Sequence, residues 1–143
     1  MGASARDTAG VSQENLALVR DAYAAFDRGD YPAMLAILSP DAITHRAPPQ
    51  PDAGTWHGPE GILQALADWT TDFENFEMSA DRFVDAGESR VIVRVRQRAT
   101  GKASGAPIEA DFWLVHTLRD RRVTRTDIFV REQQALEAAG LSN

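Results

Sequence analysis

Hydrophobic residues recur at spacings of three and four in the first half of the chain, which predicts amphipathic helices. We expect a first helix from Ser12, which can cap it, to a stop at Gly29. Asp30 is predicted to cap a short second helix with Pro32 in its first turn. The segment 58–73 is predicted as a third helix, with an apolar stripe formed by Ile62, Leu66, Trp69 and Phe73.

Beyond residue 76 the hydrophobic period changes to the alternation typical of strands. We expect strands over 78–85, 90–99, 108–118 and 123–130, separated by the turn-rich stretches AGES, GKASGAP and RDRR. An earlier strand is expected over 41–47, followed by an irregular loop with three prolines, and a short helix over 132–139. Residues 1–11 are predicted to be a disordered tail and 12–143 a single domain.

This order of elements predicts an α+β fold. We expect a strongly bent antiparallel sheet that wraps around the three N-terminal helices as a cone. Such a cone leaves a central pocket between the concave face of the sheet and the helices, and a mostly apolar pocket with a few polar groups suits a small ligand.

Composition narrows the classes of partner and site. The chain has 143 residues and a net charge of -6, which argues against nucleic acid as a partner. It has no cysteine, so thiolate chemistry and disulfides are excluded. The spacing of its three histidines matches no metal motif, and we expect neither a metal nor a cofactor. No signal-like or membrane-spanning apolar run occurs, so we expect a soluble cytoplasmic protein without a membrane partner.

Four stretches together resemble the SnoaL-like family of the nuclear transport factor 2-like superfamily. They are YAAFDRGDYPAMLAILSPDA, GTWHGPEGILQAL, RVIVRVRQRATGKASG and DRRVTRTDIFVREQQALEAAGL. The resemblance implies the cone fold. Members of the superfamily include polyketide cyclases, steroid isomerases, limonene-type epoxide hydrolases, dehydratases and proteins without known chemistry. The resemblance therefore does not define one reaction.

The resemblance also implies candidate catalytic residues. The segment RTDIF matches the last-strand aspartate of cyclases and epoxide hydrolases, which assigns that role to Asp127. The segment EAD matches the Arg-x-Asp pair of epoxide hydrolases at Asp111, but Glu109 stands where arginine is expected. Where steroid isomerases carry their base, this sequence has THRAP, which places His45 or Arg46 in that region and makes His45 a further candidate.

Each candidate has a structural alternative. Asp111 and Glu109 share a strand face, and the turn before them would bring arginines of the preceding strand opposite, as a solvated charge ladder. A shift of one residue in register would reverse this assignment. Asp127 shares its predicted face with Val123 and Phe129, which favours a partly buried carboxylate, although pairing with Arg125 on the surface is the alternative.

His116 alternates with apolar residues and is interpreted as a hydrogen-bonded core residue. The side chains predicted to line the pocket are aromatic: Tyr23, Trp56, Trp69, Phe73 and Trp113.

The function expected from these features is a cofactor-independent enzyme. It would use acid–base chemistry to cyclise, isomerise or dehydrate a small hydrophobic molecule of polyketide or terpenoid type. The alternatives are a non-catalytic ligand-binding or dimerisation domain, and a limonene-type epoxide hydrolase. Because apolar residues such as Val91 and Ile92 occupy both faces of the strands, we also expect a homodimer through the sheet.

Overall fold

The computed structural model describes residues 5–47, 54–87 and 89–141, and for residues 5–9 and Trp69 it describes the backbone alone. The elements follow in the order α1 (Ala5–Asp27), α2 (Tyr31–Leu35), β1 (Leu38–Arg46), β2 (Gly54–His57), α3 (Gly58–Thr70), β3 (Phe73–Asp85), β4 (Arg90–Gly101), β5 (Pro107–Arg119), β6 (Arg122–Phe129) and α4 (Glu132–Ala138). The four long strands β3 to β6 follow the three N-terminal helices without interruption, as the change of period predicts.

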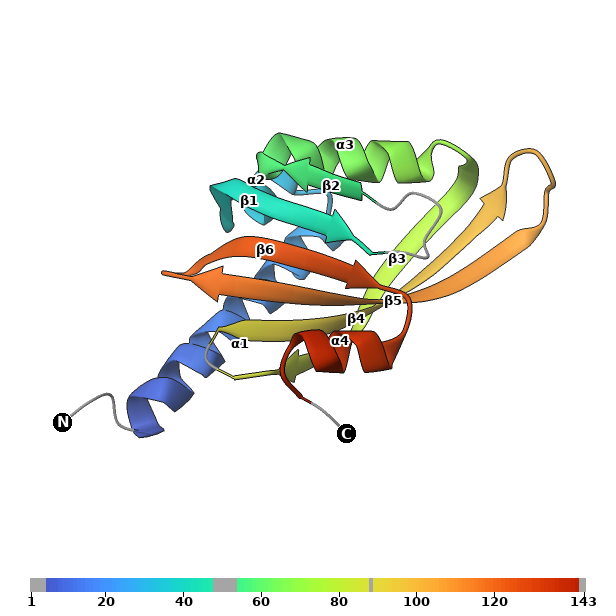
Figure 1. Cartoon of the computed structure of the whole chain (residues 1–143). Helices are drawn as coiled ribbons and strands as arrows, with labels where there is room; N and C mark the ends of the chain where they lie inside the picture. Colours follow the sequence, from blue (N-terminus) through green and yellow to red (C-terminus); the bar gives the residue numbers. More distant parts are fainter. Residues whose placement is uncertain (1–4, 48–53, 88, 142–143) are drawn as a thin grey trace.

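The strands form one curled, unclosed sheet in the order β2-β1-β6-β5-β4-β3 (Figure 1). The α+β cone expected from the sequence is thereby confirmed. One pairing differs from the purely antiparallel expectation, because β1 and β6 run parallel. The chain leaves β1, passes through β2, α3 and three long strands, and returns beside β1 in the same direction.

The helices lie on both sides of this sheet (Figure 1). The concave side, called the inner face here, is covered by α1, α2 and α3, whose side chains line a cavity together with the strands. The opposite side, called the outer face, is partly covered by α4. Ala135 of α4 and Ala139, the residue after its last turn, pack there against Ile92 and Val115. The N-terminal helices are therefore on the concave side as expected, and α4 is the exception.

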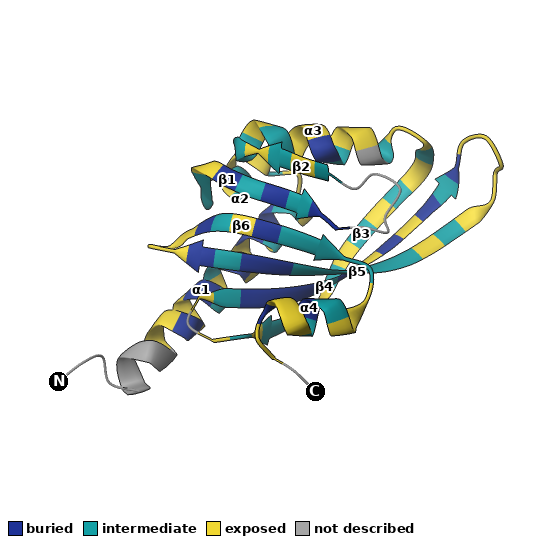
Figure 2. Cartoon of the chain, viewed as in Figure 1, coloured by how far each residue is buried: buried dark blue, intermediate teal, exposed yellow. Residues whose placement is uncertain are grey.

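The main core lies between α1 and the inner face of the central strands (Figure 2). Val19 of α1 is buried against valines of β4, and the strand pair β5–β6 closes the cluster; its fully enclosed members are Val19, Val91, Val93, Val95, Leu118 and Val123. Each such side chain stabilises the fold by about 1.5–3 kcal/mol relative to an exposed one.

Two helix boundaries show what local signals achieve. The Asp30 carboxylate accepts a hydrogen bond from the Ala33 amide at 3.2 Å, so the predicted cap of α2 is confirmed. The predicted start at Ser12 is wrong, because α1 begins at Ala5. Ser12 is a residue of the interior of α1 and is only 6% exposed, because it is buried by tertiary packing. Residues 1–4 of the expected tail lie outside the described residues.

Tertiary pairing also extends the strands beyond their predicted limits. Strand β2 was not expected, since its four residues acquire a strand partner only when β1 folds beside them. Phe73, predicted on the stripe of the third helix, is instead the first residue of β3 and pairs with Gly101. Among the described residues, no helix is long and apolar enough to cross a bilayer.

Candidate functional site

A cavity of about 200 Å³ lies between the inner face of the sheet and helices α1, α2 and α3. Most of its wall is aliphatic or aromatic, with apolar residues from every layer: Val19, Ala22, Phe26, Met34, Ile37, Leu38, Ile62, Ala65, Leu66, Met78, Val95, Phe112, Leu114, Val123 and Ile128. The polar members are Tyr23, Thr44, Arg46, Gln97, His116 and Thr126. The wall is thus apolar with a small number of placed polar groups, as in small-molecule sites.

A chain of hydrogen bonds crosses this wall from α1 to β6. The Tyr23 hydroxyl oxygen lies 2.8 Å from Nε2 of His116, and Nδ1 of His116 lies 2.8 Å from the Thr126 hydroxyl. His116 and Thr126 are directly opposite in the β5–β6 ladder, so their side chains share the inner face. The prediction that His116 is a hydrogen-bonded core residue is confirmed, and the same side chain also lines the cavity.

Burial determines the protonation of this chain. It lowers the pKa of His116 to about 4, although the negative charge of Asp127 acts in the opposite direction. It also raises the pKa of the Tyr23 phenol above its usual range. Both groups are therefore neutral at neutral pH.

A neutral imidazole donates from one nitrogen and accepts at the other. If Nε2 is the acceptor, the Tyr23 O–H donates a hydrogen bond to His116, and the lone pairs of the Tyr23 oxygen stay available to a ligand. If Nε2 carries the proton, Tyr23 accepts from it and its own O–H is free to donate into the cavity. The pair can therefore present either a donor or an acceptor to a bound molecule.

A second group of polar side chains comes from β1. Thr44 and Arg46 are two residues apart and share the inner face, and both are buried, with exposed fractions of 5% and 6%. The Arg46 guanidinium lies over the Trp56 ring at 4.9 Å, a cation–π contact that orients its plane. The Thr44 hydroxyl is buried and has no hydrogen-bond partner in the described part of the chain. Thr44 is the strand neighbour of Thr126, so the two polar groups adjoin.

Asp127, the predicted last-strand acid, does not line the cavity. Its carboxylate is held by the Arg125 guanidinium at 2.9 Å on the outer face, with 16% of its side chain exposed. The expected inward orientation is wrong because β6 carries a bulge at Thr124, opposite Thr117 and Leu118. The bulge leaves Val123 inward but turns Arg125 and Asp127 outward, so strict alternation from Val123 fails.

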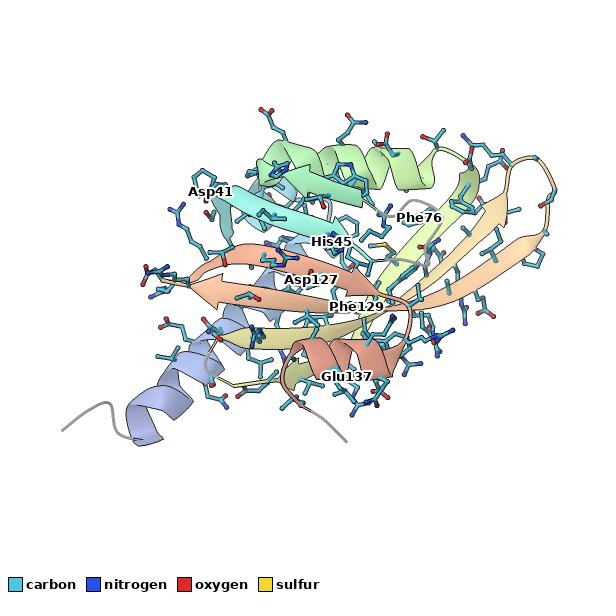
Figure 3. The ribbon with its side chains drawn as sticks, viewed as in Figure 1. Asp41, His45, Phe76, Asp127, Phe129 and Glu137 are labelled. Atoms are coloured by element: carbon cyan, nitrogen blue, oxygen red, sulfur yellow. The ribbon has the colours of Figure 1, made fainter. Side chains whose placement is uncertain are left out.

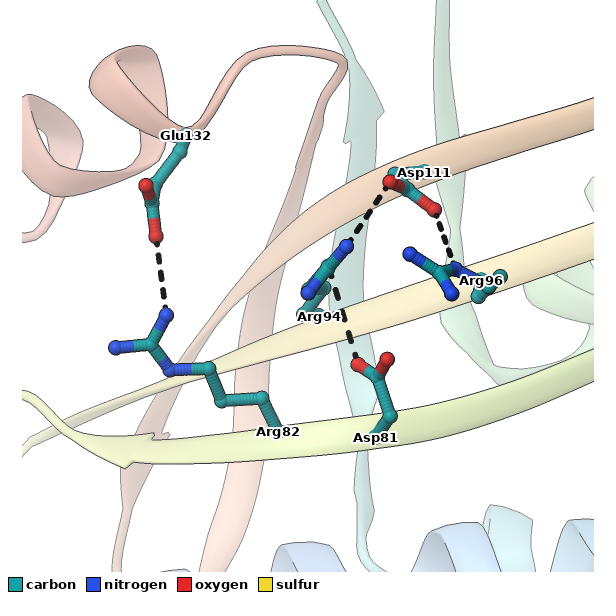
Figure 4. A network of polar contacts seen from close by, with 6 residues as sticks. All are labelled: Asp81, Arg82, Arg94, Arg96, Asp111 and Glu132. Carbon is teal, nitrogen blue, oxygen red and sulfur yellow. Dashed lines mark hydrogen bonds and ion pairs between the residues drawn. The ribbon is translucent and has the colours of Figure 1, made fainter.

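Asp111 and Glu109 also lie on the outer face, in the charge ladder that was the alternative assignment. The Asp111 carboxylate contacts Arg94 and Arg96, each at 3.1 Å (Figure 4). Glu109 contacts Arg98 at 3.0 Å. Partial burial acts to raise the pKa of Asp111, but the hydrogen bonds and charges of the two arginines outweigh it and lower that pKa. The register differs by two residues from the expected one, which had placed Arg94 opposite Asp111 and Arg96 opposite Glu109; Arg96 is opposite Asp111 and Arg98 opposite Glu109.

His45 and Asp127 lie side by side on β1 and β6 (Figure 3). Nδ1 of His45 is 3.1 Å from the Thr55 hydroxyl, and the ring is not part of the cavity wall. Because Thr44 and Arg46 point inward, the intervening His45 points outward.

Of the predicted aromatic lining residues whose side chains the structure describes, Tyr23 borders the cavity and the others do not. Trp113 packs on the outer face near α4, and its indole forms a cation–π contact with Arg94 at 6.0 Å. Trp56 packs against the Arg46 guanidinium, and Phe73 is the first residue of β3. Neither Trp56 nor Phe73 borders the cavity directly. The Trp69 side chain lies outside the described residues.

Sequence reasoning missed Thr44, Gln97 and Thr126 as cavity residues, and at the THRAP segment it preferred His45 to the neighbouring Arg46, which lines the cavity. The alternation Phe112, Leu114, His116 was a usable signal for the inner face of β5. No comparable signal existed on β1 or β6. Which of their residues face the cavity is decided by the pairing of these strands and by the bulge in β6. Within the residues that the structure describes, no three histidine or acidic side chains gather as metal ligands.

Comparisons with solved structures support the same fold. An NTF2-like protein from Burkholderia xenovorans LB400 is 28% identical, with a TM-score of 0.66 over 92% of this chain and 97% of that one. TerC, solved in a co-crystal with polyporic acid, is 23% identical, with a TM-score of 0.70 over 89% and 98%. A proposed SnoaL-like polyketide cyclase from Mesorhizobium loti is 18% identical, with a TM-score of 0.59 over 78% and 95%.

A search of curated proteins gave no significant match. The family model for the SnoaL-like domain matches residues 19–126, which is more than half of the chain and spans α1 to the middle of β6. The matched segment contains all three members of the Tyr23–His116–Thr126 chain. The chain therefore belongs to the SnoaL-like domain family.

Proposed function

We propose that this protein binds a small, mostly apolar molecule with a carbonyl or hydroxyl group in its cone, and that Tyr23 and His116 hold that group and exchange a proton with it. The reaction class is a cofactor-independent isomerisation, cyclisation or dehydration that passes through an enol or enolate. The observation that carries the proposal is the Tyr23–His116–Thr126 hydrogen-bond chain, which is built into the wall of an otherwise apolar cavity.

The size of the cavity limits the ligand. A dry apolar cavity of about 150 Å³ holds one benzene ring. A cavity of about 200 Å³ therefore accepts one ring with substituents or a compact bicyclic molecule. Transfer of such a molecule from water into the cavity supplies most of the binding free energy, and the polar groups of the wall set the orientation of the molecule.

The Tyr23 hydroxyl is suited to stabilise charge that develops on a carbonyl oxygen. His116 fixes its position through a hydrogen bond, and because the hydroxyl is buried, little water competes with a ligand for it. A pre-oriented donor in a site of low dielectric favours an enolate more than the starting ketone, which is the requirement for catalysis. Thr126 fixes the imidazole by bonding its other nitrogen.

Related structures support small-molecule binding in this fold. TerC was crystallised with polyporic acid, and a protein with a ketosteroid isomerase-like fold from Catenulispora acidiphila was crystallised with trimethylamine. A proposed polyketide cyclase and a proposed hydroxylase share the fold as well. These neighbours carry different chemistries, so the proposal for this chain rests on its own cavity.

One observation favours non-catalytic binding as a second candidate. Among the described residues of the wall, none is an aspartate or glutamate. A strong carboxylate base of the kind expected at Asp127 is absent from that wall, and His116 is the group left to take a proton. Its pKa near 4 makes it a weak base at neutral pH.

The two candidates are separated by deuterium exchange with β-tetralone, a bicyclic ketone with exchangeable α-protons. We expect the wild-type protein in deuterated buffer to accelerate exchange over buffer alone, as followed by proton NMR. Tyr23→Phe should bind the ketone but lose roughly 10²-fold of the acceleration, the usual effect of one oxyanion donor. Tyr31→Phe is the matched control, because Tyr31 is exposed on α2.

Saturable binding without acceleration would support the non-catalytic candidate. Equal exchange rates in wild type and Tyr23→Phe would remove Tyr23 from the chemistry. Absence of any cavity-directed chemical-shift change with β-tetralone or with its hydrocarbon analogue tetralin would contradict the ligand site as a whole.

A further inference from the structure

We infer that the Thr44 hydroxyl is a second hydrogen-bonding contact for the ligand, and that the cavity therefore selects molecules with an oxygen group at each end. Tyr23 and His116 hold the first of these groups, and Thr44 meets a hydroxyl or carbonyl at the opposite end of the apolar body. This inference rests on the proposed ligand site and specifies the chemical class of its occupant, a compact hydroxy-ketone or diketone.

The burial of the Thr44 hydroxyl is the first argument. Thr44 is 5% exposed and borders the cavity, and its hydroxyl oxygen has no hydrogen-bond partner within the described residues. Buried hydroxyls in folded proteins nearly always have a partner, because a group that has lost its water and gains no hydrogen bond destabilises the fold. Since Thr44 borders the cavity, a molecule bound there can supply the missing partner.

The register of three neighbouring strands is the second argument. His116 on β5 is opposite Thr126 on β6, and Thr126 is opposite Thr44 on β1. All three border the cavity, so their side chains form one line across the inner face of the sheet. Neighbouring strands are about 4.8 Å apart, which places Thr44 about 10 Å from His116 along the sheet. A bicyclic molecule with an oxygen group at each end matches this separation.

The positions of Tyr23 and Thr44 on opposite sides of the cavity are the third argument. The Tyr23 ring meets the Phe83 ring of β3 edge to face, with centroids 5.6 Å apart, and β3 is one edge of the sheet. Thr44 lies on β1, next to β2 at the other edge. The wall of the cavity is otherwise mostly apolar. A ligand with a single polar group can satisfy one of these contacts, whereas a ligand with two separated oxygen groups satisfies both.

The test compares two derivatives of β-tetralone by calorimetric titration. One carries a hydroxyl on the aromatic carbon farthest from the ketone, and the other carries a methyl group of nearly equal size there. We expect the wild-type protein to bind the hydroxyl derivative roughly three- to tenfold more tightly, the worth of one hydrogen bond. Thr44→Val should reverse the preference, because the hydroxyl would then be buried without a partner. Thr55→Val is the matched control, since Thr55 is exposed on β2 outside the cavity wall, and it should keep the wild-type preference.

Two further measurements support the same test. Thr44→Ser retains the hydroxyl and should retain the preference for the hydroxyl derivative. Thr44→Val should raise the urea midpoint of the free protein, because it removes a buried hydroxyl that has no partner. An equal or lower midpoint would show that the hydroxyl already has a partner and would overturn the inference.

The binding outcomes separate this inference from the proposed function. Equal affinity of the wild-type protein for the two derivatives would overturn the inference and leave the proposed ligand site standing. A hydroxyl preference that survives in Thr44→Val would overturn it in the same way. If β-tetralone binds and neither derivative does, the inference alone is overturned. Binding of none of the three ketones would overturn the inference together with the proposed function.

Discussion

The hydroxyl of Tyr23 lies 2.8 Å from Nε2 of His116, although 93 residues separate them. One comes from α1 and the other from β5, so the contact exists only when the helix is seated against the inner face of the sheet. The two rings also meet edge to face, with centroids 5.7 Å apart. The contact therefore couples the docking of α1 to the polar centre of the cavity.

Removal of the Tyr23 hydroxyl is expected to destabilise the fold as well as the site. Tyr23→Phe leaves a buried imidazole nitrogen without its partner, which costs about 1–3 kcal/mol of unfolding free energy. Urea denaturation followed by circular dichroism measures this loss, and Tyr31→Phe should show almost none. A Tyr23→Phe variant as stable as wild type would show that water replaces the hydroxyl at no cost.

The stability of the protein should fall as the pH drops from about 6.5 to about 4. The unfolded chain takes up a proton at His116 near pH 6.5, whereas the folded chain does so only near its depressed pKa of about 4. Between these values the unfolded state binds more protons, so this group lowers stability by up to about 1.4 kcal/mol per pH unit.

Urea midpoints measured from pH 7 to pH 5 test this slope. His116→Gln should flatten it. An unaltered slope in His116→Gln would assign the acid sensitivity to other groups.

Asp127→Asn is expected to leave ligand binding and turnover near wild type, because the carboxylate lies on the outer face beside Arg125. Arg125 is 47% exposed, so loss of the pair should change stability by no more than about 1 kcal/mol. The deuterium-exchange assay and urea denaturation measure the two effects. A large fall in exchange rate would return Asp127 to the mechanism through its charge near His116.

Arg121→Gly should stabilise the protein. Asp120 and Arg121 have φ of 52° and 65° in the two-residue turn between β5 and β6, the type I′ geometry that favours glycine at the second position. Relief of a left-handed backbone at a non-glycine residue gains about 1 kcal/mol, which exceeds the value of the exposed contact between Arg121 and Glu14. Thermal denaturation should show a higher midpoint. Arg122→Gly, within β6, is the control and should lower it.

The homodimer expected from the sequence stays a prediction, and we place its interface on the part of the outer face that α4 leaves open. This surface carries Arg94, Arg96 and Asp111 in one ladder, with Asp81 3.9 Å from Arg94 (Figure 4). Contacts between the charged side chains of two copies of this surface should weaken as salt rises. Light scattering at micromolar concentration in low and high salt tests this, and a mass near 15.7 kDa in both would contradict it.

Local signals in the sequence determined the types of most elements and several of their ends. The change from helical to alternating spacing placed the strands, and Asp30 and Gly29 separated α1 from α2, because caps and left-handed glycines act within a few residues. The core valines of β4 were also evident, since strict alternation assigns Val91, Val93 and Val95 to one face.

Tertiary structure alone decided which side chains line the cavity. The bulge at Thr124 turned Asp127 outward and Thr126 inward, a displacement of one residue that alternation cannot reveal. The parallel pairing of β1 with β6 brought Thr44 beside Thr126, although the two are far apart in the sequence. Register and handedness arise from contacts between distant strands, so the chemistry of this site depends on the assembled sheet and not on any single segment.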